Sequence, residues 1–197
     1  MNYLYYPGCS LKGAAIDYDE SFRAVASALD IGVEEMKDWK CCGATAAKSV
    51  DKNASVSLPL GTLKSAEKEG KDLLMLCPSC YANHMSIKVK AQNDIVFKET
   101  HSLNQAPEIK QFLEVLAFDI GAEKLRERIV RPLKRIRALP YYGCLAARPF
   151  RLAGTESHEN PKAMETVIEA SGAEPLFFPY KVDCCGGTLI LSREKVA

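Results

Sequence analysis

The sequence predicts an α/β fold built from two related lobes, each with a small parallel sheet flanked by helices, and with the second lobe incomplete. Short β-rich runs alternate with longer segments that carry apolar residues at helical spacing, a pattern typical of parallel sheets. The same order of short motifs occurs twice along the chain, which indicates an internal repeat. Together these observations favour two copies of one α/β unit.

The first half of the chain shows the alternation most clearly. Strands are expected at residues 2–6, 33–39 and 72–76, and helices at residues 15–29, 58–69 and from about 79 to 90. Gly32 and Gly70 follow the first two helices, where glycine commonly ends a helix. The stretch from residue 107 to about 133 has apolar residues three and four apart and is expected to be helical.

The repeat divides the chain. Residues 5–9 (YYPGC) are echoed by residues 141–144 (YYGC), and the Cys-Cys-Gly at residues 41–43 is echoed by the one at residues 184–186. The chain ends before any second Cys-x-x-Cys, so we interpret the second copy as truncated. The expected domains are a first cysteine-rich lobe at residues 1–105, a helical connection at 106–135 and a partial second lobe at 136–197.

Net charge and the distribution of apolar residues argue against several classes of function. The net charge of +1 favours neither nucleic acid nor an anionic membrane surface. The start of the chain lacks the features of a secretory signal, and no window approaches the ~18–20 apolar residues of a membrane span. We therefore expect a cytoplasmic protein, in which eight cysteines indicate metal or redox chemistry rather than disulfides.

Five cysteines form one complete pattern, C-x31-C-C-G-x33-C-P-S-C, made by Cys9, Cys41, Cys42, Cys77 and Cys80. Each follows a predicted strand, and the carboxyl ends of parallel strands share one edge of a sheet. Thiolates are the ligands of iron–sulfur clusters, and a Cys-x-x-Cys turn offers two of them. The vicinal pair is awkward for one metal but suits two different iron atoms.

Two other interpretations of these cysteines stay open. A structural zinc site could use four of the five thiols. Disulfides or free core cysteines are the remaining possibility, although a reducing compartment disfavours disulfides. The Cys-Pro-Ser-Cys motif alone would also suit a thiol oxidoreductase, so the prediction depends on its combination with the repeated Cys-Cys-Gly.

Several motifs resemble the B subunit of heterodisulfide reductase, a member of the CCG or cysteine-rich domain family. They are YYPGCSLK, DWKCCGA, CPSCYA, YYGC and FPYKVDCCGG, at residues 5–12, 38–44, 77–82, 141–144 and 178–187. The resemblance implies that the five cysteines of the first motif hold a non-cubane 4Fe–4S cluster, a fused 3Fe–4S/2Fe–2S arrangement. It also implies that Cys144, Cys184 and Cys185 are the first three ligands of a second, catalytic cluster, whose closing Cys-x-x-Cys is missing here.

The resemblance further implies a function and partners. The expected function is an electron-transfer or catalytic subunit that reduces a small-molecule disulfide with electrons delivered one at a time, together with an iron–sulfur (C-like) subunit and a flavin (A-like) subunit. Related proteins serve succinate or fumarate redox complexes, or lactate and glycolate oxidation, which is the alternative. A zinc-stabilised interaction module is the alternative from another class. Aerobic preparation could strip the cluster and leave the cysteines free, disulfide-linked or loaded with zinc.

Several residues near these motifs have simpler interpretations. His84 follows Cys80 by four residues on an expected helix, but an exposed or capping histidine is the preferred interpretation. Trp39 and the tyrosines beside Cys9 and Cys144 suit either packing or shielding of a cluster from water. Arg148 and Lys181 are expected to be solvated surface charges.

Overall fold

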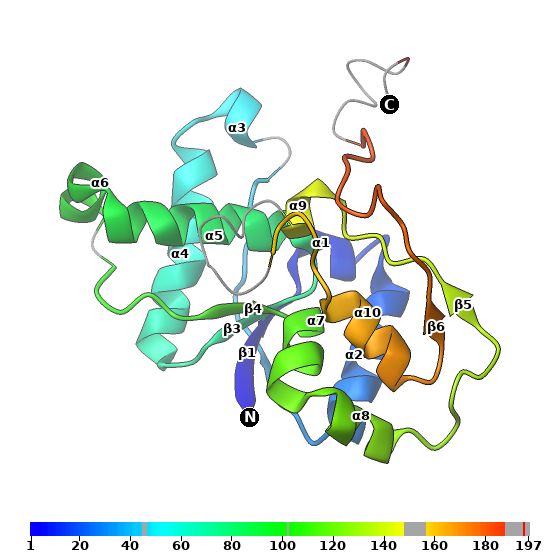
Figure 1. The fold of residues 1–197 in the computed structure, drawn as a ribbon. Coiled ribbons are helices and arrows are strands. Elements are labelled where there is room, and N and C mark those ends of the chain that lie inside the picture. Colours follow the sequence, from blue (N-terminus) through cyan, green and yellow to red (C-terminus); the bar gives the residue numbers. More distant parts are fainter. Residues whose placement is uncertain (45–46, 102, 148–156, 188–194, 196–197) are drawn as a thin grey trace. The chain divides into compact units, whose positions relative to one another are not determined.

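The computed structural model describes the chain except for residues 45–46, 102, 148–156, 188–194 and 196–197. It divides into two compact units, Met1–Phe112 and Leu113–Ala197. Figure 1 shows the chain in sequence colours, with the first unit running from blue to green. The two units are called unit 1 and unit 2 below.

Unit 1 is built on a four-stranded parallel sheet in the order β2-β1-β3-β4. The strands are β1 (Asn2–Tyr6), β2 (Gly32–Glu35), β3 (Leu73–Met75) and β4 (Ile109–Gln111). The two central strands are almost entirely buried, which explains their unbroken apolar sequences LYY and LLM. The expected α/β class with parallel pairing is confirmed.

The described helices of unit 1 are α1 (Gly8–Leu11), α2 (Ile16–Ala28), α3 (Ala47–Val50), α4 (Ala54–Glu69), α5 (Pro78–Asn93) and α6 (Ile95–Thr100). In Figure 1, α2 lies on one side of the sheet, and α4 and α5 lie on the other. Right-handed crossovers produce this arrangement, because the chain moves from β1 to β2 in one direction and from β2 through β3 to β4 in the other.

The core of unit 1 lies on both faces of the sheet. Phe22 of α2 contacts Tyr5 of β1, with ring centroids 4.8 Å apart, and also Phe112, at 4.7 Å. On the other face Leu63 of α4 is fully buried. Burying a large apolar side chain of this kind contributes about 1.5–3 kcal/mol. These contacts fix the central strands, and with them the loops that follow their carboxyl ends.

Unit 2 has a smaller sheet in which β5 (Arg137–Ala138) pairs in parallel with β6 (Glu174–Pro175). Its described helices are most of α7 (Phe112–Glu114), the π-helix η1 (Val115–Ile120), α8 (Ala122–Arg128), α9 (Gly143–Ala147) and α10 (Ala163–Ala170). The parallel β5–β6 pair repeats the β1–β2 pair of unit 1, as the internal repeat predicted.

Three expected elements differ from the structure. The second strand ends at Glu35 rather than at residue 39, and α4 begins at Ala54, with Pro59 in its second turn. The helical prediction for residues 107–133 is wrong at β4, where Ile109–Gln111 pairs with β3 instead. The sequence IKQ lacks the unbroken apolar run that indicated β3, so only the pairing with β3 reveals this strand. In the described part of the chain, no helix has the length and apolarity of a membrane span.

Candidate metal centre

The parallel sheet of unit 1 brings its five cysteines to one edge. Cys9 lies in α1 directly after β1, and the Cys41–Cys42 pair lies in the loop after β2. Cys77 follows β3 by two residues, and Cys80 lies in the first turn of α5. The connections from β1 and β3 leave in opposite directions, and a crevice forms outside the carboxyl ends of strands at such a switch point. The five residues are called the five-thiol site.

Four sulfurs of the five-thiol site form two pairs, and the fifth is hydrogen-bonded to a member of one pair. The Sγ atoms of Cys9 and Cys41 lie 3.9 Å apart, and those of Cys42 and Cys80 lie 3.3 Å apart. Cys77 shares a hydrogen bond with Cys80 across the turn of the Cys-x-x-Cys. The adjacent residues Cys41 and Cys42 therefore direct their thiols to different partners. No disulfide joins any of the five.

The site is closed on one side and open on the other. Cys42 and Cys80 are each 3% exposed, whereas Cys9 and Cys41 are exposed and Cys77 is half-buried. The Asn83 side-chain amide donates a 2.6 Å hydrogen bond to the carbonyl of Cys42, which holds the buried side of the loop against α5. A group bound here would contact protein on its inner side and solvent on its outer side.

The thiols differ in acidity. Hydrogen bonding with the Cys80 thiol lowers the pKa of Cys42 to about 7 and that of Cys77 to about 6, and backbone N–H groups add to both effects. The same two hydrogen bonds raise the pKa of Cys80. Burial raises the pKa of Cys9, and its contact with Cys41 adds to the shift. Near neutral pH the Cys77 thiol, and in part that of Cys42, is therefore ionised while Cys80 keeps its proton, and a bound cation would replace that proton.

Two glycines give the backbone room at the site. Gly8 has a φ of +66°, and a Cβ there would lie 3.0 Å from the Cys80 Sγ atom. Gly43 has a φ of +71°, and its backbone N–H donates to the Cys41 Sγ atom over 3.5 Å. Both positions need positive φ, which L side chains rarely adopt. The glycines in Pro-Gly-Cys and Cys-Cys-Gly are therefore structural requirements of the cysteine turns.

Unit 2 repeats part of this arrangement. Cys144 lies in α9, and Cys184 and Cys185 lie in the loop after β6. Loss of hydration raises the pKa of Tyr141, and the charges of the three cysteines of unit 2 raise it further. The N–H groups of Gly186 and Gly187 donate to the sulfurs of Cys184 and Cys185, each over 3.4 Å. The Cys-Cys turn of unit 2 thus repeats the glycine N–H contact to sulfur that unit 1 has at Gly43.

Comparison with known proteins identifies the family. Residues 3–84 and 138–196 match the CCG cysteine-rich domain, one match for each unit. This chain belongs to the CCG cysteine-rich domain family.

Relatives place this CCG chain among redox subunits. The 8-methylmenaquinol:fumarate reductase membrane anchor subunit of Wolinella succinogenes is 31% identical over 99% of this chain and 70% of its own length. The B subunit of the ferredoxin:CoB-CoM heterodisulfide reductase of Methanosarcina mazei is 28% identical over 91% of this chain. Its ferredoxin/F420H2-dependent counterpart from Methanosarcina acetivorans is 26% identical over 92% of this chain.

The predicted resemblance to the heterodisulfide reductase B subunit is confirmed, and a redox-related role follows for the family in general. The chain spans 63% of the length of each Methanosarcina relative. The Wolinella relative is named a membrane anchor, so the comparisons do not support a cytoplasmic location over a membrane-associated one.

The residues of the five-thiol site fit the iron–sulfur group that the CCG family implies. The donor set consists entirely of soft thiolates, and Gly8 leaves a cradle that a Cβ would fill. Among the residues that the structure describes, no three metal-ligating side chains converge as they would around a single ion. Thiols set in two pairs with a fifth beside them match a group with several metal atoms, in which each iron takes its own ligands.

His84 corrects one expectation from the sequence. It is 0% exposed rather than exposed or capping, and its ring lies against Tyr6 with centroids 4.9 Å apart. Its Nδ1 lies 2.8 Å from the carbonyl oxygen of Cys80, and Nε2 has no hydrogen-bond partner among the residues that the structure describes. Burial lowers the pKa of His84 to about 4, so the ring is neutral. The spacing of four residues in α5 puts His84 on the same helix face as Cys80, and this was the sequence signal for its position.

Lys181 also differs from its expected role as a solvated charge. It is buried, and its Nζ donates 2.5 Å hydrogen bonds to Glu165 Oε1 and to the carbonyl of Pro161. Glu165 in turn accepts a hydrogen bond from the Tyr142 hydroxyl over 2.6 Å. Lys181 thus fixes the loop before Cys184. Arg148 lies outside the described residues.

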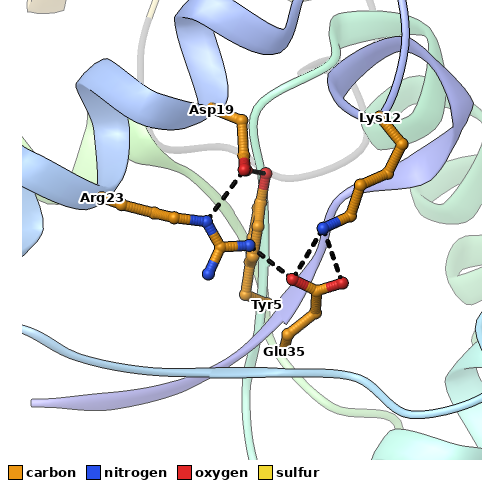
Figure 2. Close-up of polar contacts among 5 residues, drawn as sticks. All are labelled: Tyr5, Lys12, Asp19, Arg23 and Glu35. Carbon is orange, nitrogen blue, oxygen red and sulfur yellow. Dashed lines mark hydrogen bonds and ion pairs between the residues drawn. The ribbon is translucent and has the colours of Figure 1, made fainter.

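A polar network behind the first cysteine turn had no sequence signal. The Tyr5 hydroxyl donates to Asp19, and Arg23 donates to Asp19 over 2.8 Å and to Glu35 over 2.5 Å. Figure 2 shows that Lys12 completes the chain of contacts by reaching Glu35. These five residues come from β1, α2, the start of the loop after α1, and β2. Asp19 and Arg23 are four residues apart in α2, a spacing at which helical side chains meet, whereas Tyr5, Lys12 and Glu35 reach them only through the fold.

Proposed function

We propose that this chain is an iron–sulfur subunit of a multi-subunit oxidoreductase, in which the five-thiol site holds one cluster. The observation that carries the proposal is the convergence of five thiols from three neighbouring strand ends in a chain of the CCG family. When bound, the cluster would supply one-electron transfer. The chain's own residues bind it, orient it and exclude water from its inner side.

Each part of the site has a separate task in this proposal. The divergent Cys41 and Cys42 would bind different metal atoms, since their sulfurs lie beside Cys9 and Cys80 respectively. The buried pair Cys42 and Cys80 would face a dry wall formed by Tyr6 and His84. The exposed pair Cys9 and Cys41 would lie on the side where electrons enter or leave.

The reaction proposed for the complex is reduction of a small-molecule disulfide. Cleavage of one S–S bond consumes two electrons and two protons and gives two thiols, so one-electron carriers must act twice. The supporting observations are the two Methanosarcina relatives, both heterodisulfide reductase B subunits. Under this proposal Cys144, Cys184 and Cys185 contribute to the catalytic cluster, and a C-like iron–sulfur subunit and an A-like flavin subunit supply the electrons.

A second candidate is a subunit that connects a fumarate or succinate enzyme to its electron carrier. A specific observation favours it, because the fumarate reductase anchor subunit matches 99% of this chain at 31% identity, against 26–28% for the Methanosarcina proteins. The five-thiol site would then carry electrons without cleaving a disulfide. The role of the site as an electron carrier is common to both candidates.

Metal analysis tests the shared part of the proposal. The chain should be expressed with its neighbouring subunits, purified without oxygen, and measured for iron, acid-labile sulfide and zinc, with EPR spectra before and after reduction. We expect iron and sulfide in near-equal amounts and a signal that changes with redox state. Fully loaded protein that contains zinc alone would overturn the proposal in favour of a structural module.

Substrate assays separate the two candidates. The same complex should be reduced chemically and mixed in turn with an asymmetric thiol disulfide and with fumarate. Reoxidation by the disulfide, with release of two thiols, supports the first candidate. Reoxidation by fumarate alone rejects the first candidate and supports the second.

A further inference from the structure

The two cysteine turns share one contact that the cysteine pattern does not include. The Tyr6 hydroxyl donates a 2.6 Å hydrogen bond to the backbone carbonyl of Lys40, and the Tyr141 hydroxyl donates a 2.8 Å bond to that of Asp183. Each tyrosine stands three residues before the first cysteine of its unit. Each carbonyl belongs to the residue directly before the Cys-Cys pair. The two copies thus make the same long-range bond at the same positions.

The backbone between tyrosine and cysteine is also the same in both copies. Gly8 and Gly143 have φ values of +66° and +68°. A Cβ on Gly8 would lie 3.1 Å from the Tyr6 ring, and one on Gly143 would lie 3.6 Å from the Tyr141 ring. The positive φ turns the backbone so that the Tyr6 ring lies over Gly8 and the Tyr141 ring lies over Gly143. This turn aims the hydroxyl at the Cys-Cys loop.

The bond to the main chain explains why the residue before the cysteines can differ. Lys40 and Asp183 have opposite charges, but each contributes only its carbonyl oxygen to the contact. A main-chain acceptor is available from any residue type. The repeated feature is therefore the tyrosine hydroxyl and the backbone, and neither depends on the side chain at the acceptor position.

We propose that Tyr6, and Tyr141 in unit 2, is a positioning residue that fixes the peptide before the Cys-Cys pair so that the two adjacent thiols point to different partners. The carbonyl of Lys40 is held on one side, so the following backbone has little freedom. With that backbone fixed, Cys41 reaches Cys9 and Cys42 reaches Cys80. The inference rests on the proposed function and deepens it, since divergence of the pair is what two different metal atoms require.

Tyr6 has stronger support than Tyr141. Tyr6 is 1% exposed, and its ring is held by Trp39 and by His84, with centroids 5.9 and 4.9 Å away. Tyr141 is 42% exposed. A hydrogen bond shielded from water is harder to replace by solvent. Loss of the hydroxyl should therefore disturb the unit 1 turn more than the unit 2 turn.

Disulfide trapping tests the proposal without any cluster. Reduced, metal-free chain is treated briefly with diamide, which oxidises two neighbouring thiols to a disulfide and is itself reduced to the hydrazine. The Cys9–Cys41 bridge is then quantified against the Cys77–Cys80 bridge, which lies outside the Cys-Cys loop. We expect Tyr6→Phe to lower this ratio about fivefold, the factor that corresponds to one net hydrogen bond of about 1 kcal/mol. The matched control is Tyr3→Phe on the same strand, whose hydroxyl lies near the Met1 sulfur.

Two further variants keep the test decisive. Replacing Tyr6 by 4-aminophenylalanine restores an N–H donor, so it should restore the bridge ratio if the hydrogen bond is what matters. If Tyr6→Phe does not fold, the more exposed Tyr141→Phe is used, and the ratio of Cys184 to Cys185 alkylation should change. A wild-type ratio in the folded Phe variant, or no rescue by the amino analogue, overturns the inference.

The cluster itself provides a second readout. In oxygen-free preparations Tyr6→Phe should alter the EPR signal or lower the iron content, whereas Tyr3→Phe should match the wild type. If the wild-type chain takes up no iron, the proposed function fails. The bridge ratio still tests the role of Tyr6 in that case, because it is measured on metal-free chain. If the wild type loads iron and the bridge ratio does not respond to Tyr6, the inference fails alone.

Discussion

Gly8 shows at the scale of one residue how the first cysteine turn depends on backbone freedom. Its positive φ and the 3.0 Å approach of a Cβ to the Cys80 sulfur act together, so a side chain would be strained and would also enter the space beside the thiols. Gly70, at the end of α4, has a similar φ of +61° but open space around it. Substitution of Gly70 therefore carries only the cost of a side chain at positive φ, whereas substitution of Gly8 also carries the cost of close contacts.

We predict that Gly8→Ala destabilises the chain more than Gly70→Ala. Alanine in the left-handed region costs roughly 1–2 kcal/mol at either site, and the forced shift of Cys80 or Tyr6 adds roughly 1–3 kcal/mol at residue 8. Denaturant unfolding of the metal-free variants measures both values. Equal losses at the two positions would show that the approach to Cys80 does not matter.

Thiol acidity gives a second prediction at the residue scale. Hydrogen bonding with Cys80 lowers the pKa of Cys77 to about 6, whereas burial raises that of Cys9. In metal-free protein at pH 7, Cys77 should therefore react with iodoacetamide a few-fold faster than Cys9, although Cys9 is more exposed. The much larger thiolate fraction of Cys77 is partly offset by its lower nucleophilicity.

Mass-spectrometric labelling from pH 5 to 9 checks this order. Labelling of Cys77 should rise through about pH 6 and then level off, whereas that of Cys9 should still increase at the alkaline end. Faster labelling of Cys9 at pH 7 would contradict the assigned acidities.

The cysteines could be predicted from the sequence, but their surroundings could not. Spacing after short strands was enough to gather Cys9, Cys42 and Cys80 at one edge of the sheet. It could not say that Cys42 and Cys80 are buried while Cys9 is exposed, because burial depends on side chains such as Tyr6 from another strand. The Tyr6 hydroxyl bond to Lys40 spans 34 positions, so no local pattern signals it.

At the scale of secondary-structure elements, the network of Figure 2 connects α2 to the first two strands. Asp19 is the buried member, and it accepts hydrogen bonds from Tyr5 and Arg23. Burial raises the pKa of Asp19, but these hydrogen bonds outweigh burial and hold the pKa below its ordinary 3.8. The carboxylate thus stabilises the contact between α2 and β1 only while it is charged.

We predict that Asp19→Asn lowers the free energy of unfolding at pH 7 by about 1–3 kcal/mol, because Tyr5 and Arg23 lose a charged acceptor. The contribution of Asp19 is fully present above its unfolded pKa and is lost as pH falls through its lower folded pKa. The variant should therefore show a shallower loss of stability between about pH 5 and pH 2. Urea unfolding across that range measures the slope.

Glu34→Gln is the control for this prediction. Glu34 pairs with Lys71 at the exposed surface, where solvent screens the interaction. Its substitution should change stability little at pH 7. A Glu34→Gln effect as large as that of Asp19→Asn would contradict a special role for the buried carboxylate.

Elements with a periodic pattern or an unbroken apolar run were predictable, and elements with neither were not. Helix α2 lies within one residue of its expected bounds at each end, because its apolar residues recur at helical spacing. Strand β4 was missed, since Ile109–Gln111 lacks an unbroken apolar run and depends on pairing with β3. Helix α4 starts earlier than expected, with Pro59 in its second turn, where proline cannot donate the usual helical hydrogen bond.

At the scale of the whole molecule, the repeat is visible in the structure at several levels. A parallel strand pair, a positive-φ glycine before the first cysteine and a positive-φ glycine after the Cys-Cys pair occur in each unit. The division into a lobe at residues 1–105, a connection and a partial second lobe stays a prediction. So does the ligand role of each cysteine, which family membership supports but which requires a metal measurement.

The metal and sulfide content of single Cys→Ser variants prepared without oxygen is the sharpest test of the five-thiol site. We expect each substitution to lower bound iron and sulfide, including both members of the vicinal pair; the variants are those of Cys9, Cys41, Cys42, Cys77 and Cys80. Cys144→Ser, in the other unit, is the matched control and should retain the cluster of the five-thiol site. If one of the five substitutions leaves the metal content intact, with zinc as the bound metal, the site is a structural zinc site and not an iron–sulfur site.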